Sequence, residues 1–142
     1  MTTIERLLKQ KGNQVWAIHP QASVLEALTL MAEKGIGALL VMDETGPLGV
    51  ISERDYARSV ALKGKTSRST PVRDIMTSPV VCATPHQRVA EALALMTDRR
   101  VRHLPVMDGD QLLGMVSIGD LVKSIISEQE IMIEQLEGYI SA

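Results

Sequence analysis

The chain of 142 residues contains the same sequence pattern twice. Val15–Ser59 aligns with Val80–Ser124 without a gap, and the constant offset is 65 residues, the difference between Pro85 and Pro20. A repeat of this length predicts two similar units that pack together, with any ligand clefts arising between them. This symmetry constrains both the fold and the places where function can lie.

Each repeat predicts the element order strand, helix, strand, strand, helix. Short first strands are expected at Val15–Ile18 and Val80–Ala83. Ser23 and Glu26 form a capping-box pattern that opens the first helix, and Gly35 fits its end. The hairpin strands are expected at Ala38–Met42, Leu48–Ile51, Leu104–Met107 and Leu112–Val116. The fold class is therefore α/β (α+β), built from two pseudo-two-fold β-α-β-β-α repeats.

Segments outside the repeats also have predicted structures. Thr2–Glu5 resembles a helix cap and predicts a short leading helix to about Lys11, and Ser127–Ile140 predicts a trailing amphipathic helix. The predicted division is an N-terminal helix (1–13), repeat 1 (14–62), a basic linker and lead-in (63–78), repeat 2 (79–126) and a C-terminal amphipathic helix (127–142).

Composition excludes several classes of function. Apolar residues make up 45% of the chain, enough for a folded core. Because the net charge is −2, the chain has no general attraction to nucleic acid or anionic membranes, and we expect it to bind neither. The three histidines lack the spacing of a metal site, and Cys82, the only cysteine, fits a packed thiol in a reducing compartment. A cytoplasmic, non-enzymatic protein is expected, since no activated nucleophile or metal-carboxylate cluster stands out.

The pattern Gly-x-x-Ser-x-x-Asp occurs in both repeats, where a strand runs into a helix. The copies are Gly49–Asp55 and Gly114–Asp120. One interpretation is helix capping, with Ser as N-cap and Asp at N3. The other is a ligand site, because a helix N-terminus attracts phosphate and a carboxylate accepts hydroxyls of a ribose diol. The two interpretations do not exclude each other, and two copies in register strengthen the second.

At this point the chain resembles the tandem CBS-domain module, named after cystathionine β-synthase. The resemblance covers about Gln14–Ile126 and rests on the element order, both Gly-x-x-Ser-x-x-Asp copies, the segment Arg99–Asp108 and the lead-in Val72–Pro79. It implies two clefts between the repeats that hold an adenosine-containing ligand such as AMP, ADP, ATP, NAD or S-adenosylmethionine.

The resemblance also implies roles for individual residues. Ribose hydroxyls are expected on Asp55 and Asp120, and ribose or phosphate near Ser52 and Ser117. The adenine region is expected at Ile18, His19, Pro20, Ala83, Thr84 and Pro85.

The repeats differ at positions that bear on phosphate binding. Arg102-His103 replaces Gly37-Ala38 of the first repeat, and both are phosphate candidates, expected to reach the cleft that Ser52 and Asp55 line; their alternative is a solvated strand end. Arg54 has Gly119 as its counterpart, so only one cleft gains that charge.

The leading hypothesis is a stand-alone regulatory module that binds an adenine nucleotide and signals to a separate protein effector through a change of shape or oligomeric contacts. A homodimer is expected, and the apolar trailing helix suits its interface. The alternative is a ligand-free dimeric scaffold or protein-interaction module. An enzyme such as a nucleotide hydrolase is the weakest of the three hypotheses.

Overall fold

The computed structural model describes residues 2–141, which divide into two compact units. The first-repeat unit is Val15–Val81, and the second-repeat unit combines the chain up to Gln14 with the chain from Cys82 onward. The helix before the first repeat therefore belongs with the second repeat. The two outermost predicted segment ends, at positions 1 and 142, lie outside the described residues.

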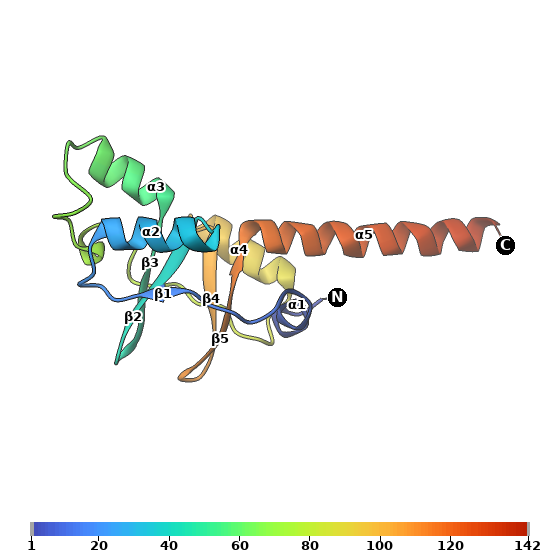
Figure 1. Cartoon of the computed structure of the whole chain (residues 1–142). Coiled ribbons are helices and arrows are strands. Elements are labelled where there is room, and N and C mark those ends of the chain that lie inside the picture. The colour runs from blue at the N-terminus through green and yellow to red at the C-terminus, as the bar shows by residue number, and fades with distance from the viewer. Residues whose placement is uncertain (1, 142) are drawn as a thin grey trace. The chain divides into compact units, whose positions relative to one another are not determined.

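The first-repeat unit contains a three-stranded sheet in the order β1-β2-β3 (Figure 1). Its strands are β1 (Ala17–Ile18), β2 (Ala38–Asp43) and β3 (Gly46–Ser52). β1 is parallel to β2, and β2 pairs with β3 in an antiparallel hairpin. The helical segments of this unit are α2 (Val24–Lys34), α3 (Glu53–Tyr56), a π-helical turn (Ala57–Ala61) and a 3-10 turn (Val72–Asp74).

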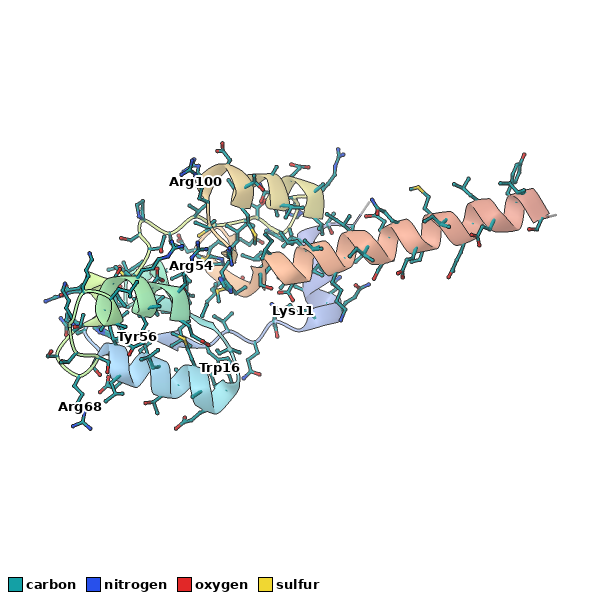
Figure 2. All side chains as sticks on the ribbon, turned by 90° about the horizontal axis from the view of Figure 1, so that it is seen from above. Lys11, Trp16, Arg54, Tyr56, Arg68 and Arg100 are labelled. Atoms are coloured by element: carbon teal, nitrogen blue, oxygen red, sulfur yellow. The ribbon has the colours of Figure 1, made fainter. Side chains whose placement is uncertain are left out.

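The core of the first-repeat unit lies between α2 and the sheet. Its buried side chains are Val24, Ala27, Met31, Leu39, Val41, Ile51, Val60, Val72 and Ile75. Trp16 and Tyr56 pack against this core (Figure 2), and the Lys34 ammonium lies 4.3 Å from the centre of the Trp16 indole. Trp16 is thus held by packing and by a cation–π contact within its own unit.

The second-repeat unit contains α1 (Ile4–Lys11), α4 (Val89–Arg99), the antiparallel hairpin β4 (His103–Asp108) and β5 (Gln111–Ser117), and α5 (Ile118–Ser141). Each of these five elements contributes buried apolar residues to the core of the unit, from Ile4 on α1 to Leu121 on α5. α5 packs against α4, and α1 also contacts α4.

The two predicted first strands are shorter than expected. The first is only Ala17–Ile18, and the prediction of a strand over Val80–Ala83 is wrong, because this segment makes a single parallel bridge between Ala83 and Val106. Pro79 directly precedes the second of these segments, and Pro85 follows it by two residues; both lack the N–H that would extend a ladder there. The hairpins match their predicted positions, with one or two residues added at the ends.

The predicted start and end of α2 are confirmed. Ser23 accepts a hydrogen bond from the Glu26 backbone N–H, and the Glu26 carboxylate accepts one from the Ser23 N–H. Gly35 ends the helix in the left-handed conformation, at φ 65°. In the second repeat Arg88 gives no side-chain cap, and Arg100 takes the left-handed position at φ 56°.

The last helix of the second repeat and the predicted trailing helix are one continuous helix, α5. The helical segment of the first repeat ends at Ala61, and the turn that follows it contains Gly64, which is left-handed at φ 69°. The equivalent of Gly64 in the second repeat is Gln129, which lies inside α5. Figure 1 shows α5 continuing past the other elements of its unit. The predicted leading helix is also confirmed, with Thr3 as its N-cap. Within residues 2–141, no helix has the length and apolar character needed to cross a membrane.

Candidate functional site

The Gly-x-x-Ser-x-x-Asp turn of the first repeat forms a capping box at the start of α3. The Ser52 N–H donates to Asp55 Oδ2 at 2.8 Å, and the Ser52 hydroxyl donates to the same oxygen at 3.0 Å. The Asp55 N–H donates back to Ser52 Oγ at 3.3 Å. The capping interpretation of this pattern is therefore confirmed.

The second repeat builds the same turn at the start of α5. The Ser117 N–H donates to Asp120 Oδ2 at 2.8 Å, and the Asp120 N–H donates to Ser117 Oγ at 3.1 Å. Both aspartates are half-buried. Each repeat thus holds one carboxylate in a fixed position at the carboxyl end of its hairpin.

The glycine of each pattern allows another part of the chain to approach the sheet. A Cβ on Gly49 would lie 2.5 Å from the carbonyl oxygen of Thr77, and a Cβ on Gly114 would lie 2.9 Å from Leu8 Cδ2. Thr77 exchanges two backbone hydrogen bonds with Val50, of 3.1 and 2.8 Å. In each unit, the segment that precedes the other repeat therefore packs on the hairpin.

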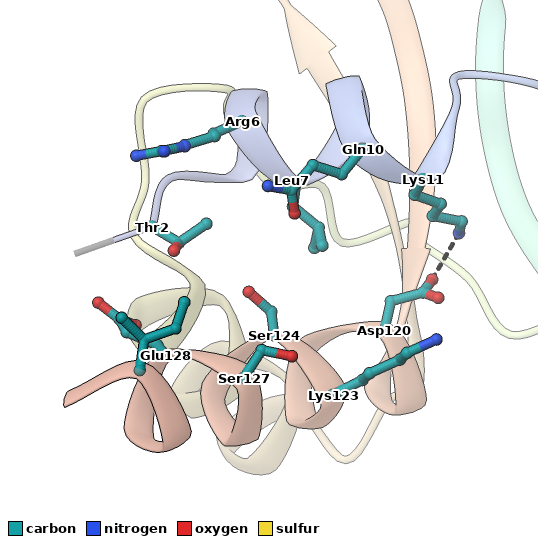
Figure 3. Close-up of a pocket in the computed structure, with 11 residues that line it drawn as sticks. Thr2, Arg6, Leu7, Gln10, Lys11, Asp120, Lys123, Ser124, Ser127 and Glu128 are labelled. Atoms are coloured by element: carbon teal, nitrogen blue, oxygen red, sulfur yellow. Dashed lines mark hydrogen bonds and ion pairs between the residues drawn. The ribbon is translucent and has the colours of Figure 1, made fainter. Parts of the chain in front are cut away.

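The two carboxylates differ in what these preceding segments offer them. Asp55 Oδ1 lies 3.5 Å from the Thr77 hydroxyl, a neutral and weak partner. Asp120 Oδ2 instead accepts a hydrogen bond of 2.5 Å from the Lys11 ammonium, which also donates to the Met115 carbonyl at 2.6 Å (Figure 3). The preceding segment therefore gives Asp55 a hydroxyl as its partner and gives Asp120 a cation.

The Lys11 contact alters the acidity of Asp120. Burial of this carboxyl raises its pKa, but the Lys11 ammonium and the Ser117 backbone N–H together favour the ionised form more strongly. The pKa of Asp120 is lowered from 3.8 as a result. The carboxylate is ionised at neutral pH.

The three basic residues predicted for phosphate lie near these turns. Arg54 is exposed on α3. Arg102 is exposed, and its carbonyl accepts a hydrogen bond of 2.9 Å from the Ile118 N–H. His103 pairs in register with Ser117, so Arg102 and His103 flank the turn that holds Asp120. Their predicted reach to the Asp55 turn concerns the other unit and stays a prediction.

The residues predicted for the adenine region occupy equivalent places in the two units. Pro20, Ala83 and Pro85 are buried, Ile18 is half-buried, and His19 and Thr84 are exposed. The Pro20 carbonyl accepts a hydrogen bond of 3.0 Å from the Arg73 N–H, and the Pro85 carbonyl accepts one of 2.9 Å from the Glu5 N–H. The preceding segments therefore engage main-chain acceptors in the predicted adenine region too.

A cavity of about 560 Å³ lies between α1 and α5 of the second-repeat unit (Figure 3). Its lining residues include Arg6, Lys11, Asp120, Lys123, Ser124 and Ser127. The volume falls within the usual range for small-molecule sites. Within residues 2–141, no three side chains of His, Cys, Asp or Glu are grouped to hold a metal ion. Burial raises the pKa of the half-buried Cys82 thiol, which favours its packing role.

Sequence analysis missed Lys11 and Thr77 as partners of the two aspartates. Lys11 is 109 residues from Asp120, and the sequence pattern marks it only as the end of a helix. The offset of the repeat places Gly12, not Lys11, opposite Thr77, so the alignment gives no signal for this equivalence. Only the packing of the preceding segments brings these residues to the carboxylates.

Comparisons with known proteins place both repeats in one family. The model of the CBS domain matches residues 12–62 and 72–127. "CBS domain-containing protein CBSX3, mitochondrial" of Arabidopsis thaliana is 37% identical over 149 residues, covering 98% of this chain and 72% of the relative. A solved structure from Burkholderia ambifaria MC40-6, described as a candidate signal-transduction protein with CBS domains, is 48% identical with a TM-score of 0.84; the match covers 90% of this chain and 96% of that one. The hexameric CBS-CP12 protein from bloom-forming cyanobacteria is 28% identical with a TM-score of 0.76, over 86% of this chain and 70% of that one.

Proposed function

Because this chain belongs to the CBS-domain family and contains two of its repeats, we propose that it is a regulatory module that binds AMP, ADP, ATP or NAD. One observation carries the proposal: each unit fixes a half-buried aspartate at a strand-to-helix turn, with the same capping geometry in both. A ligand held at such a turn can shift an equilibrium between two shapes or assemblies, provided that it binds them with different affinity. The protein effector that reads this shift is part of the proposal.

The capping bonds leave the aspartates able to accept more hydrogen bonds. A carboxylate offers about four lone-pair sites, and the cap uses only Oδ2 of each residue. We assign the ribose diol to Asp55 and Asp120, with Ser52 and Ser117 beside it. Arg54, Arg102 and His103 are the proposed phosphate ligands. The adenine is assigned to the segments around Pro20 and Pro85.

Titration calorimetry with AMP, ADP, ATP and NAD tests this proposal on protein refolded free of carried-over ligand. We expect micromolar binding of at least one nucleotide, with one or two molecules per chain. Asp55→Asn and Asp120→Asn should each weaken binding by about 1–3 kcal/mol. Asparagine is chosen because alanine would also remove the capping acceptor, a loss of about 1 kcal/mol in stability.

Asp98→Asn is the matched control, since Asp98 is an exposed carboxylate that pairs with Arg99 on α4. It should bind every nucleotide like the wild type. If none of the four ligands binds, the nucleotide proposal is wrong, and the ligand-free scaffold becomes the better hypothesis.

The proposed partner in assembly is a second copy of this chain, held through α5. All but two of the exposed large apolar residues in the described part of the chain lie on this helix; the exceptions are Leu25 and Leu62. The similarity to a hexameric CBS-CP12 protein supports assembly of CBS modules in general. The single unpaired cysteine supports the proposed cytoplasmic location.

The spacing on α5 favours a parallel, in-register pair. Apolar positions alternate in steps of four and three at Val122, Ile126, Ile133, Leu136 and Ile140, with Gln129 completing the series. These are the a and d positions of a coiled coil, with isoleucine at every a position. In a parallel pair Gln129 meets its own copy, whereas an antiparallel pair would place its amide against Ile133.

A further inference from the structure

The Lys11–Asp120 ion pair lies where the proposed ligand would bind. The Lys11 ammonium is 2.5 Å from Asp120 Oδ2, and both side chains are only partly exposed, at 34% and 26%. A diol that donates one hydroxyl to each oxygen of Asp120 must therefore compete with the cation that already holds Oδ2. Ligand binding at Asp120 therefore depends on whether the Lys11 ammonium leaves this carboxylate.

The first-repeat unit offers a neutral partner at the equivalent carboxylate. Asp55 is approached by the hydroxyl of Thr77, at 3.5 Å. A neutral hydroxyl can turn aside without leaving an uncompensated charge. The two units therefore offer a ligand equivalent carboxylates, but a ligand that displaces the partner of Asp120 leaves a charge uncompensated, whereas one that displaces the partner of Asp55 does not.

The surroundings of Lys11 determine which ligand can displace it. A neutral nucleoside would leave a partly buried ammonium without its counter-ion, which is unfavourable. A ligand with a phosphate group could take over the ammonium, and charge-assisted hydrogen bonds of this kind are about twice as strong as neutral ones.

Space for such a group exists beside the ion pair. Lys11 and Asp120 line one end of the cavity between α1 and α5, which also contains Lys123 and the hydroxyls of Ser124 and Ser127 (Figure 3). Lys123 follows Asp120 by three residues on α5, so it lies on the same side of the helix. An anionic group beside the ion pair would meet these two ammonium groups, and the cavity is also lined by the Arg6 guanidinium and the Glu128 carboxylate.

We propose that Lys11 is a displaceable counter-ion that makes the second-repeat unit select diol-bearing anions, the chemical class of nucleotides, over neutral nucleosides. This inference rests on the proposed function, because it assumes that Asp120 accepts a ribose diol. Lys11 is then a specificity-determining residue that contacts the ligand's anionic group after leaving Asp120.

The test compares AMP with adenosine by titration calorimetry in an Asp55→Asn background, so that binding reports on the second-repeat unit. With Lys11 present, AMP should bind about tenfold more tightly than adenosine, or better, as one charge-assisted contact provides. In Lys11→Met this ratio should fall about tenfold, through weaker AMP binding and equal or tighter adenosine binding. Lys11→Arg should retain most of the preference.

Lys9→Met is the matched control, because it removes the same charge from the same helix. Lys9 is 75% exposed and pairs with Glu5 at 3.6 Å, away from Asp120. Its ratio of AMP to adenosine affinity should equal that of the background. Circular dichroism melts check each variant, and Lys11→Gln replaces Lys11→Met if the latter does not fold.

Three results would overturn the inference. An unchanged ratio in the Lys11 variants would remove Lys11 from ligand selection while leaving the nucleotide site intact. An equal fall of the ratio of AMP to adenosine affinity in Lys9→Met would show that the preference comes from the overall charge of α1 and not from Lys11 itself. Absence of binding by both compounds, in the wild type as well, would reject this inference, and the proposed function would fall with it only if ADP, ATP and NAD also do not bind.

Discussion

At the scale of single residues, the glycines of the two Gly-x-x-Ser-x-x-Asp patterns face different obstacles. A side chain on Gly49 would meet the backbone carbonyl of Thr77 at 2.5 Å, whereas one on Gly114 would meet the flexible tip of Leu8 at 2.9 Å. The Thr77 backbone cannot move without breaking its bridge to Val50. We expect Gly49→Ala to destabilise by about 3 kcal/mol and Gly114→Ala by about 1 kcal/mol, as measured by urea unfolding.

Gly138→Ala is the control for this pair of substitutions. Gly138 lies in α5, and an added Cβ would have no neighbouring atom within 4 Å, so alanine should raise helix stability by about 0.5–1 kcal/mol. Equal losses for Gly49→Ala and Gly114→Ala would contradict the explanation by backbone contact.

The Lys11–Asp120 pair predicts a pH-dependent contribution to stability. The pKa of Asp120 is lowered in the folded protein, so the contribution is fully present above the unfolded pKa and is lost as pH falls through the folded one. At pH 7, Lys11→Met should lower the free energy of unfolding by about 1 kcal/mol.

Urea unfolding of both proteins from pH 7 down to about pH 2 provides the measurement, since the ordinary Asp pKa is about 3.9. The difference between wild type and Lys11→Met should shrink toward zero as Asp120 becomes protonated. A difference that does not change with pH would mean that Lys11 stabilises by packing and by its bond to the Met115 carbonyl alone.

At the scale of elements, helix α2 depends on a local cap. Ser23 and Glu26 satisfy each other's backbone N–H groups. Ser23→Ala should destabilise the protein by about 1 kcal/mol, and Ser23→Asp, which keeps an acceptor, should lose much less. Thermal unfolding followed by circular dichroism measures both, and similar losses in the two variants would show that the hydroxyl does not act as the cap.

Local chemistry also explains how much of the structure could be predicted. The start and end of α2 follow from Ser23, Glu26 and Gly35, all within or beside one helix, and the hairpins follow from alternating turns and apolar runs. The first strands are shorter than their apolar runs predict, because their pairing depends on β2 and β4. α5 continues where the first repeat has a turn with the left-handed Gly64, whose equivalent is Gln129, a difference that lies beyond the aligned residues.

The candidate site also combines features that follow from local sequence with features that depend on packing between distant segments. Capping by Ser52 and Ser117 was predictable, since each partner aspartate is three residues away. The ion pair of Lys11 with Asp120 was not, because no short-range pattern connects residues that far apart in sequence. This ion pair forms only because α1 packs beside β5, and Gly114 permits that packing.

At the scale of the whole molecule, the proposed dimer concentrates its interface on one helix. The a and d residues of α5 are between 40% and 81% exposed where they are apolar, so the described part of the chain leaves much of their surface uncovered. Leu136→Glu would place two carboxylates at the same level of a parallel pair. Sedimentation equilibrium should show a dimer for the wild type and a dissociation constant raised by about a hundredfold or more for this variant.

Gln135→Glu adds the same charge at the neighbouring position, which faces away from the proposed interface, and should remain dimeric. Leu136→Cys in a Cys82→Ser background then tests the orientation, because an antiparallel pair would separate the two thiols by about 15 Å along the helix axis. Rapid disulfide formation under mild oxidation is expected for the parallel pair. A monomeric wild type would reject α5 as a self-association surface, and a dimer without this disulfide would reject only its parallel orientation.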